Sequence, residues 1–178
     1  MNNYYINTNE LNSKIHQLRA GDKVMLSGTV FTARDAAHKR LIPIINEGGK
    51  LPFNLKNSAI YYAGPTPTPL GLAIGSCGPT TSSRMDSFTP TLLENGVKCM
   101  IGKGPRNSEV LKSIIENGAI YLCAIGGAGA LAAKCITNCD VIAFDELGCE
   151  SIKKLEFKDF PLIVGIDRFG GTLFETNK

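Results

Sequence analysis

The amino-acid sequence predicts a single α/β domain, because strand and helix patterns alternate along the chain with little connecting sequence. The expected strands are continuous apolar runs, which are typical of a sheet covered on both faces. The chain has 178 residues, 43% of them hydrophobic, and this is enough to bury one core. No repeat, low-complexity tract or linker divides the sequence, so we expect one domain over residues 1–178.

The first half is expected to hold two helices and two strands. Asn7 as a cap, with Glu10 three residues later, predicts a helix within an N-terminal helical segment at residues 1–20. A second helix is capped by Asp35, and Pro43 is expected to kink or shorten it. Apolar runs predict strands over residues 23–32 and 59–63.

The second half continues the alternation after a proline-rich loop. Apolar runs predict strands over residues 97–101, 119–125, 141–144 and 162–166. Start signals predict helices at Thr89 and at Ser108, which is expected to be a cap, and a third helix over residues 128–137.

Charge and hydropathy exclude several classes of protein. Nineteen Lys and Arg against sixteen Asp and Glu give a net charge of +3 without a basic run, which argues against a nucleic-acid partner. The N-terminus lacks the pattern of a signal peptide, and no apolar run approaches the ~20 residues of a membrane helix. We therefore expect a cytoplasmic protein that binds neither nucleic acid nor membrane.

The six cysteines are expected to be reduced and mostly structural. Cys135, Cys139 and Cys149 fit neither zinc nor ferredoxin spacing. Cys99 and Cys123 lie inside apolar runs, where a thiol usually behaves as a small hydrophobe. We expect no metal ligand on this chain.

The segment from Gly75 to Asp86 carries chemistry that a buried core segment would not. It follows an apolar run, and Gly78 and Pro79 form a rigid turn beside hydroxyl side chains and an arginine. A buried loop would have to satisfy all of these polar groups, whereas hydroxyls, backbone amides and a forked guanidinium can bind an anion. The segment is therefore the first candidate functional site.

Polar residues recur at the ends of three expected strands. The clusters are Arg34, Asp35 and His38, then Thr80, Thr81 and Arg84, then residues 103–107 with Lys103 and Arg106. Ligands of open α/β sheets lie beyond the carboxyl ends of strands, so two arginines and a lysine there suit a small substrate with two carboxylates. Each cation taken alone is also consistent with a solvated surface residue. His38 is consistent either with a general acid or base or with a histidine that hydrogen-bonds a carbonyl.

A glycine-rich segment, residues 126–132, follows an expected strand and opens a helix. Gly127, Gly129 and Ala132 approximate a dinucleotide fingerprint, with Asp145 eighteen residues beyond Gly127 at an expected strand end. Fewer than sixty residues remain after residue 119 to complete a nucleotide domain. A tight strand-to-helix turn packed by small residues is therefore the favoured interpretation.

Several separated motifs, in order, resemble the beta subunit of class I iron–sulfur fumarate hydratases, a family that also contains the beta subunit of L(+)-tartrate dehydratase. The motifs are residues 28–38, 61–65, 75–86, 101–104 and 125–128. The resemblance runs from about residue 20 to the C-terminus. It implies a swivelling β/β/α domain and a share in the trans-hydration of a dicarboxylate.

The resemblance also implies roles for four residues. Arg34 and Arg84 resemble the arginines that grip the substrate carboxylates. Thr80 resembles the threonine that removes a proton from the carbon next to a carboxylate. Lys103 resembles the active-site lysine of a Lys-Gly motif.

Other positions match the family without an assigned role. Asp35 and His38 match such positions, and with Thr81 they are candidate supporting residues. Pro105 and Asn107 depart from the pattern, since the family more often has asparagine and serine there.

The resemblance implies a 4Fe–4S cluster held by three cysteines of an alpha subunit, whose exposed iron acts as a Lewis acid on the substrate hydroxyl. We therefore expect a hetero-oligomer with that alpha subunit, and reversible hydration of fumarate to (S)-malate. The alternatives are the beta subunit of L(+)-tartrate dehydratase and, from a different class, a stand-alone nucleotide- or anion-binding module. A homodimer is an alternative state of the isolated chain.

Overall fold

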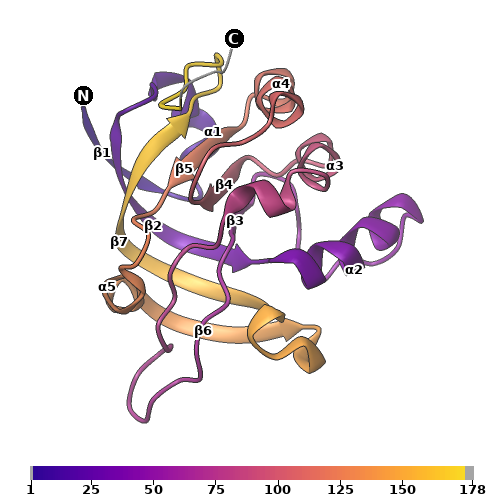
Figure 1. Ribbon diagram of the computed structural model, residues 1–178, viewed down its shortest axis with the longest axis vertical. Coiled ribbons are helices and arrows are strands. Elements are labelled where there is room, and N and C mark those ends of the chain that lie inside the picture. The colour runs from indigo at the N-terminus through magenta and orange to yellow at the C-terminus, as the bar shows by residue number, and fades with distance from the viewer. Residues whose placement is uncertain (1, 175–178) are drawn as a thin grey trace.

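The computed structural model describes residues 2–174 and shows one mixed sheet with helices beside it (Figure 1). The strands are β1 (Asn3–Asn7), β2 (Lys23–Thr32), β3 (Ala59–Tyr61), β4 (Cys99–Gly102), β5 (Ile120–Cys123), β6 (Ile136–Ala143) and β7 (Ile152–Ile166). The helices are α1 (Leu11–Lys14), η1 (Ile15–Gln17), α2 (Asp35–Asn46), η2 (Ser82–Met85), α3 (Thr89–Glu94), α4 (Ser108–Asn117), α5 (Gly129–Lys134) and η3 (Asp145–Glu150). The predicted α/β class is confirmed.

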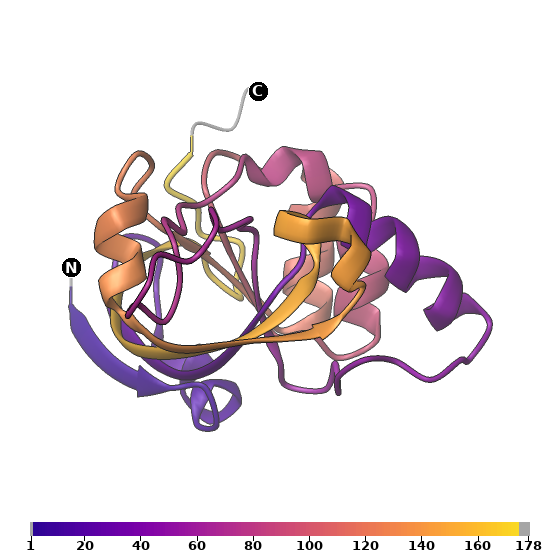
Figure 2. The same cartoon turned by 90° about the horizontal axis from the view of Figure 1, so that it is seen from below.

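The strand order is β1-β2-β3-β4-β5-β7-β6, and a further pairing between β2 and β7 closes the sheet on itself. Strands β2, β3, β4, β5 and β7 thus form a ring, which curves around its interior in Figure 2. Strands β2 to β5 run parallel to one another, whereas β7 is antiparallel to both β2 and β5. The carboxyl ends of four parallel strands therefore lie along one edge.

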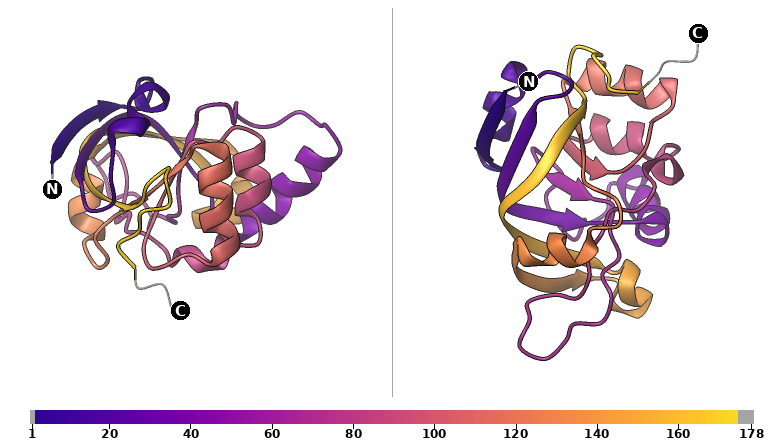
Figure 3. Two further views of the ribbon diagram at one scale, coloured as in Figure 1. Left: turned by 90° about the horizontal axis from the view of Figure 1, so that it is seen from above. Right: turned by 60° about the vertical axis from the view of Figure 1, so that its left-hand side comes forward.

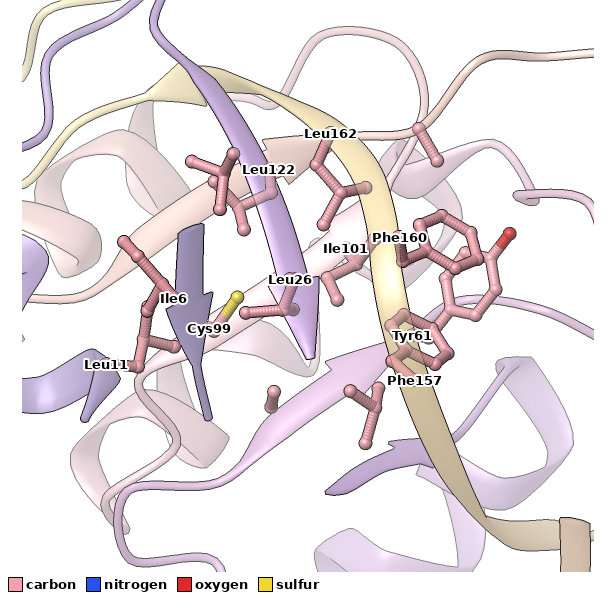
Figure 4. Packing of buried hydrophobic residues seen from close by; sticks show 14 of the residues in the cluster. Ile6, Leu11, Leu26, Tyr61, Cys99, Ile101, Leu122, Phe157, Phe160 and Leu162 are labelled. Atoms are coloured by element: carbon pink, nitrogen blue, oxygen red, sulfur yellow. The ribbon is translucent and has the colours of Figure 1, made fainter. Parts of the chain in front are cut away.

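The interior of the ring is filled by alternate side chains of its strands. On β3, Ala59 and Tyr61 point into this core, and Ile60 between them belongs to the other face. The ring of Tyr61 meets Phe157 and Phe160 of β7 edge-on at 5.8 and 5.6 Å (Figure 4). Aromatic side chains thus join β3 to β7 across the interior.

The outer face of the sheet packs against α2, α3 and α4. Ile60, Met100 and Tyr121 on the sheet meet the apolar stripes of these helices. Figure 3 shows α3 and α4 side by side on this flank. The sheet is therefore covered inside and outside along β3 to β5, as their continuous apolar runs predict.

The helix boundaries follow local chemistry. Asn107 is the cap of α4, because its side chain accepts a hydrogen bond of 2.9 Å from the Val110 amide. Ser108, the predicted cap, is instead the first helical residue. Pro43 lies inside α2, which continues to Asn46, so of the two predicted effects, a kink or a shorter helix, the shortening does not occur. Within residues 2–174, no helix is long and apolar enough to span a bilayer.

Three strands differ from the prediction. Residues 3–7 form β1 within the segment expected to be helical, and β6 begins at Ile136, inside the expected helix 128–137. The expected strand 162–166 is only the last third of β7. Buried and exposed residues intermingle along these strands, so they lack the continuous apolar runs that predict the others.

Candidate functional site

The predicted site residues follow successive parallel strands. Arg34 and Asp35 come after β2, Thr80 to Arg84 after β3, and Lys103 after β4. Because these strands are parallel neighbours, their carboxyl ends place the residues along one edge of the sheet. In both open α/β sheets and closed α/β barrels, ligands bind beyond the carboxyl ends of the parallel strands.

The two candidate substrate-binding arginines meet at one carboxylate. Arg84 Nε donates to Asp35 Oδ1 at 3.0 Å, and Arg34 Nε lies 4.0 Å from Asp35 Oδ2. The side chain of Arg84 is 52% exposed and that of Arg34 is 18% exposed. The structure therefore brings these guanidinium groups to the same place, and their part in substrate binding stays a prediction.

A second carboxylate, that of Glu150, also contacts the Arg34 guanidinium. Its Oε1 is 3.2 Å from Arg34 Nη2, and its Oε2 accepts a hydrogen bond of 2.9 Å from the Ala36 amide in the first turn of α2. The Arg34 side chain lies against Gly64, where a Cβ would come within 2.7 Å of Nη1. The sequence alone does not indicate Glu150 as a site residue. It is a single acidic residue, and it precedes the part of β7 that was not predicted as a strand.

The central loop is fixed by its backbone. The Thr80 amide donates to the Tyr62 carbonyl at 2.6 Å, and Thr81 forms a parallel bridge with Lys103. The Ser82 amide donates to the Lys103 carbonyl at 2.9 Å. The two candidate threonines and the lysine are therefore neighbours, with Thr80 and Lys103 half-buried and Thr81 exposed.

The glycine-rich turn after β5 lies beside this loop. The Cys77 amide donates to the Gly129 carbonyl at 3.0 Å, and a Cβ on Gly126 would lie 3.5 Å from Lys103 Cδ. Helix α5 has six residues and leads into β6, which pairs antiparallel with β7. Strands β5 and β6 are not neighbours, because β7 lies between them, so α5 does not join two adjacent parallel strands as in a dinucleotide-binding unit. Asp145 comes two residues after the end of β6, as the first residue of η3. The tight-turn interpretation is thus favoured over the dinucleotide fingerprint.

The buried side chain of Arg106 links two of the segments that carry the site residues. Its side chain is 0% exposed, and it donates to Asp86 at 2.6 Å and to Thr89 at 2.7 Å. The guanidinium carbon lies 5.3 and 5.1 Å from the ring centres of Tyr62 and Tyr121. A buried charge needs such complete pairing, so Arg106 locks the segment after η2 to the loop after β4.

Tyr121 adds a second tie between the same segments. Its hydroxyl donates to the Gly104 carbonyl at 2.9 Å and lies 2.9 Å from Ser82 Oγ. Gly102, the last residue of β4, has no room for a Cβ, because Ser82 and Tyr62 pack against it. The positions of Lys103 and Arg84 therefore depend on this buried layer.

His38 is fully buried beneath the arginine pair. Its Nδ1 lies 2.7 Å from the Arg34 carbonyl and donates to it, since a carbonyl can only accept. The ring stacks on Phe88, and burial lowers the pKa of His38 to about 4. This geometry favours the carbonyl-bonding interpretation of His38 over a general acid or base.

The cysteines do not fit a 4Fe–4S cluster on this chain. All six are free thiols, of which Cys77 and Cys99 are buried and Cys149 is exposed. Burial raises the pKa of Cys77 to about 12 and also raises that of Cys99. Over residues 2–174, no three His, Cys, Asp or Glu side chains gather as a group that could hold a metal ion.

Comparison with known proteins identifies relatives over almost the whole chain. The model of the family described as "Fumarase C-terminus" matches residues 2–177, so the likeness begins earlier than residue 20. "Fumarate hydratase class I, anaerobic" of Escherichia coli is 39% identical over 168 residues, which are 93% of this chain and 31% of that protein. "Fumarate hydratase 2" of Leishmania major is 39% identical over 167 residues, which are 93% of this chain and 29% of that protein.

A relative named as a separate subunit matches along most of its length. The "Putative L(+)-tartrate dehydratase subunit beta" of Methanocaldococcus jannaschii is 38% identical over 174 residues, which are 94% of this chain and 89% of that protein. The chain thus spans about a third of the fumarate hydratases that it matches but nearly all of this subunit. On the family match and this coverage together, the chain belongs to the fumarase C-terminus family.

Proposed function

We propose that this chain is the beta subunit of an iron–sulfur-dependent hydro-lyase that reversibly hydrates fumarate to (S)-malate. The observation that carries the proposal is the pair of arginines, Arg34 and Arg84, joined through Asp35 at the carboxyl edge of four parallel strands. The fumarate hydratases among the relatives support this substrate. The near full-length match to a tartrate dehydratase subunit supports L(+)-tartrate as the alternative.

The proposed chemistry divides among four side chains. The guanidinium forks of Arg34 and Arg84 bind the two substrate carboxylates, and Lys103 adds a point charge. These cations stabilise the enolate-like charge that develops when the carbon next to a carboxylate loses its proton. Thr80 exchanges that proton, and because a hydroxyl is a weak base, neighbouring cations or loop amides must favour its alkoxide.

The partner is proposed to dock on the face around α5. Ile125 and Leu131 are each 64% exposed, and Leu70 in the neighbouring loop is fully exposed. A cavity of about 270 Å³, lined by Ile125, Leu131 and Pro161 among others, has an almost entirely apolar lining. Since this face adjoins Lys103 through the glycine-rich turn, a partner seated there would close the site.

We propose that this partner is an alpha subunit that carries the 4Fe–4S cluster, which when bound supplies Lewis-acid chemistry at the substrate hydroxyl. The subunit naming of the tartrate dehydratase relatives supports a two-chain enzyme. The free thiols of this chain are in keeping with a cytoplasmic location.

The test is coexpression with a candidate alpha subunit, followed by an oxygen-free assay with malate, fumarate and tartrate. We expect turnover of one of these substrates by the pair and none by either chain alone. The isolated chain should be colourless, and anaerobic reconstitution should give it no iron–sulfur absorbance. A strong cluster spectrum on this chain alone, or tight NAD binding by calorimetry, would contradict the proposal.

Arg84→Ala is the sharpest variant, with Arg40→Ala as its matched control. Both arginines are about half exposed and pair with one carboxylate, since Arg40 lies 3.0 Å from Glu146. Losing a charge-assisted fork should lower kcat/KM by about a hundredfold for Arg84→Ala. The control should keep normal kinetics, and near-normal kinetics for Arg84→Ala would remove that residue from the site.

A further inference from the structure

Glu150 makes two contacts with two different groups. Its Oε1 forms an ion pair with Arg34 Nη2, and its Oε2 accepts a hydrogen bond from the Ala36 amide at the start of α2. A carboxylate at this place suits both partners, because the first amides of a helix lack intrahelical acceptors and favour negative charge. Glu150 therefore ties the arginine to a rigid element.

Few protein groups bond the rest of the Arg34 guanidinium among the described contacts. Arg34 Nε and Asp35 Oδ2 are both buried, and neither has a hydrogen-bond partner in the described structure. They face each other at 4.0 Å, beyond hydrogen-bonding distance. Asp35 is instead committed through Oδ1 to Arg84. Glu150 is thus the carboxylate closest to the Arg34 guanidinium, and it fixes the group from the Nη2 side.

Element order explains how a residue so distant in sequence reaches Arg34. Glu150 is the last residue of η3, and β7 starts two residues later. Because β7 runs antiparallel to β2, with Phe31 opposite Lys154, the start of β7 lies beside the end of β2. The antiparallel strand thereby brings a carboxylate to the edge at which the parallel strands deliver cations.

We propose that Glu150 is a positioning residue for the hydro-lyase reaction: it orients the Arg34 guanidinium toward a substrate carboxylate by anchoring it to the first turn of α2. This rests on the proposed function. A long arginine side chain has many rotamers in solution, and holding it in one before substrate arrives removes that ordering from the binding step. Glu150 itself need not touch the substrate.

Glu150→Gln separates orientation from structure. Glutamine can still accept the Ala36 amide through its carbonyl oxygen, but it no longer offers Arg34 a charged partner. In the assembled enzyme we expect kcat/KM to fall roughly tenfold to a hundredfold, the range for one charge-assisted hydrogen bond. The thermal midpoint of the isolated chain should change little. The matched control is Glu146→Gln, an exposed acid of the same η3 segment that pairs with Arg40, and it should leave kinetics unchanged.

A double variant shows whether Glu150 acts through Arg34. If it does, adding Glu150→Gln to Arg34→Lys should cost much less than it costs in the wild-type background, because the group that it positions is already altered. Fully additive losses would overturn the proposal. Wild-type kinetics for Glu150→Gln would overturn it too, while leaving the hydro-lyase function intact.

The positioning role can also be tested on the isolated chain by NMR, which does not depend on whether the assembled enzyme turns over any of the three substrates. The Arg34 Nε–H resonance of the isolated chain, assigned by its loss in Arg34→Lys, should be sharp and dispersed in wild-type protein. It should broaden or move to the position of a mobile arginine in Glu150→Gln and stay in place in Glu146→Gln. An unmoved signal in Glu150→Gln would refute the positioning role whatever the enzyme does.

Discussion

The buried His38 side chain is predicted to make the stability of the fold depend on pH, by an amount that follows from its environment in the structure. The imidazole is 0% exposed, its Nδ1 donates to the Arg34 carbonyl, and its Nε2 is buried with no hydrogen-bond partner among residues 2–174. Burial disfavours the charged ring and lowers the pKa of His38 from 6.5 to about 4. The native state therefore holds this histidine neutral at a pH where the unfolded chain protonates it.

Proton linkage gives the direction and the size of the resulting change in the free energy of unfolding with pH. Because the native pKa lies below the unfolded one, the stability that depends on the neutral ring is complete above pH 6.5 and is lost as the pH falls toward 4. The loss should reach about 2 kcal/mol at pH 5 and about 3 kcal/mol below pH 4, since each pKa unit is worth about 1.4 kcal/mol. For a chain of this size, the loss at pH 5 corresponds to a drop in Tm of about 4–8 °C.

The assay is urea unfolding of the wild-type chain and of His38→Gln between pH 7 and pH 5. The wild-type free energy of unfolding should fall more steeply with acid than that of the variant, by about 2 kcal/mol over the range. His16→Gln is the control, because His16 is exposed and a solvated ring loses little hydration on folding. If His38→Gln folds poorly, an NMR titration of the wild-type His38 ring decides. Parallel slopes for wild type and His38→Gln, or titration of the native ring near pH 6.5, would refute the reasoning.

Two further predictions concern the buried layer next to the site, and a third concerns the accessibility of the thiols. Gly102→Ala should destabilise the fold by about 1–3 kcal/mol in urea unfolding, because its Cβ has no room, whereas Gly126→Ala meets only an ordinary contact at 3.5 Å and should be tolerated. Arg106→Gln should cost about 3–5 kcal/mol by leaving a buried carboxylate unpaired. Lys112→Gln, which breaks an exposed pair, should change Tm little. Brief iodoacetamide treatment of the native chain should label Cys149 before the buried Cys77 and Cys99, and equal labelling of these three thiols would contradict that burial.

The fold was predictable where burial is two-sided. Strands β4 and β5 were predicted to within a few residues, because their apolar runs are continuous. Strand β2 was predicted over its full range, 23–32, although its buried residues alternate with less buried ones. Strand β7 was largely missed because its first ten residues alternate between buried Leu155 and Phe157 and exposed Lys154 and Lys158. Such alternation indicates a strand with one solvated face, and the ring closes through that strand.

The sequence could predict only those site residues that directly follow a predicted strand. Arg34 and Lys103 follow recognisable strands, so the strand-end rule places them on one edge. Glu150 reaches the same edge through the antiparallel pairing of β7, which the sequence did not predict. The ion pair between Arg34 and Glu150 joins residues far apart in the chain, and only the register of the sheet brings them together.

What distinguishes a binding arginine from a structural one here is whether its donors are already used. Arg106 stands in the same predicted polar cluster as Lys103, yet its guanidinium is sealed between two tyrosine rings and bonded to Asp86 and Thr89. Arg84 is half exposed and bonds the protein through Nε alone among the described contacts, so its two terminal nitrogens are not committed to protein partners there. Arginine donates through five N–H groups in a fixed fork, so a carboxylate bound at one edge leaves the other edge available. The contact with Asp35 therefore leaves Arg84 donors for the proposed substrate, whereas the donors of Arg106 are already used within the protein.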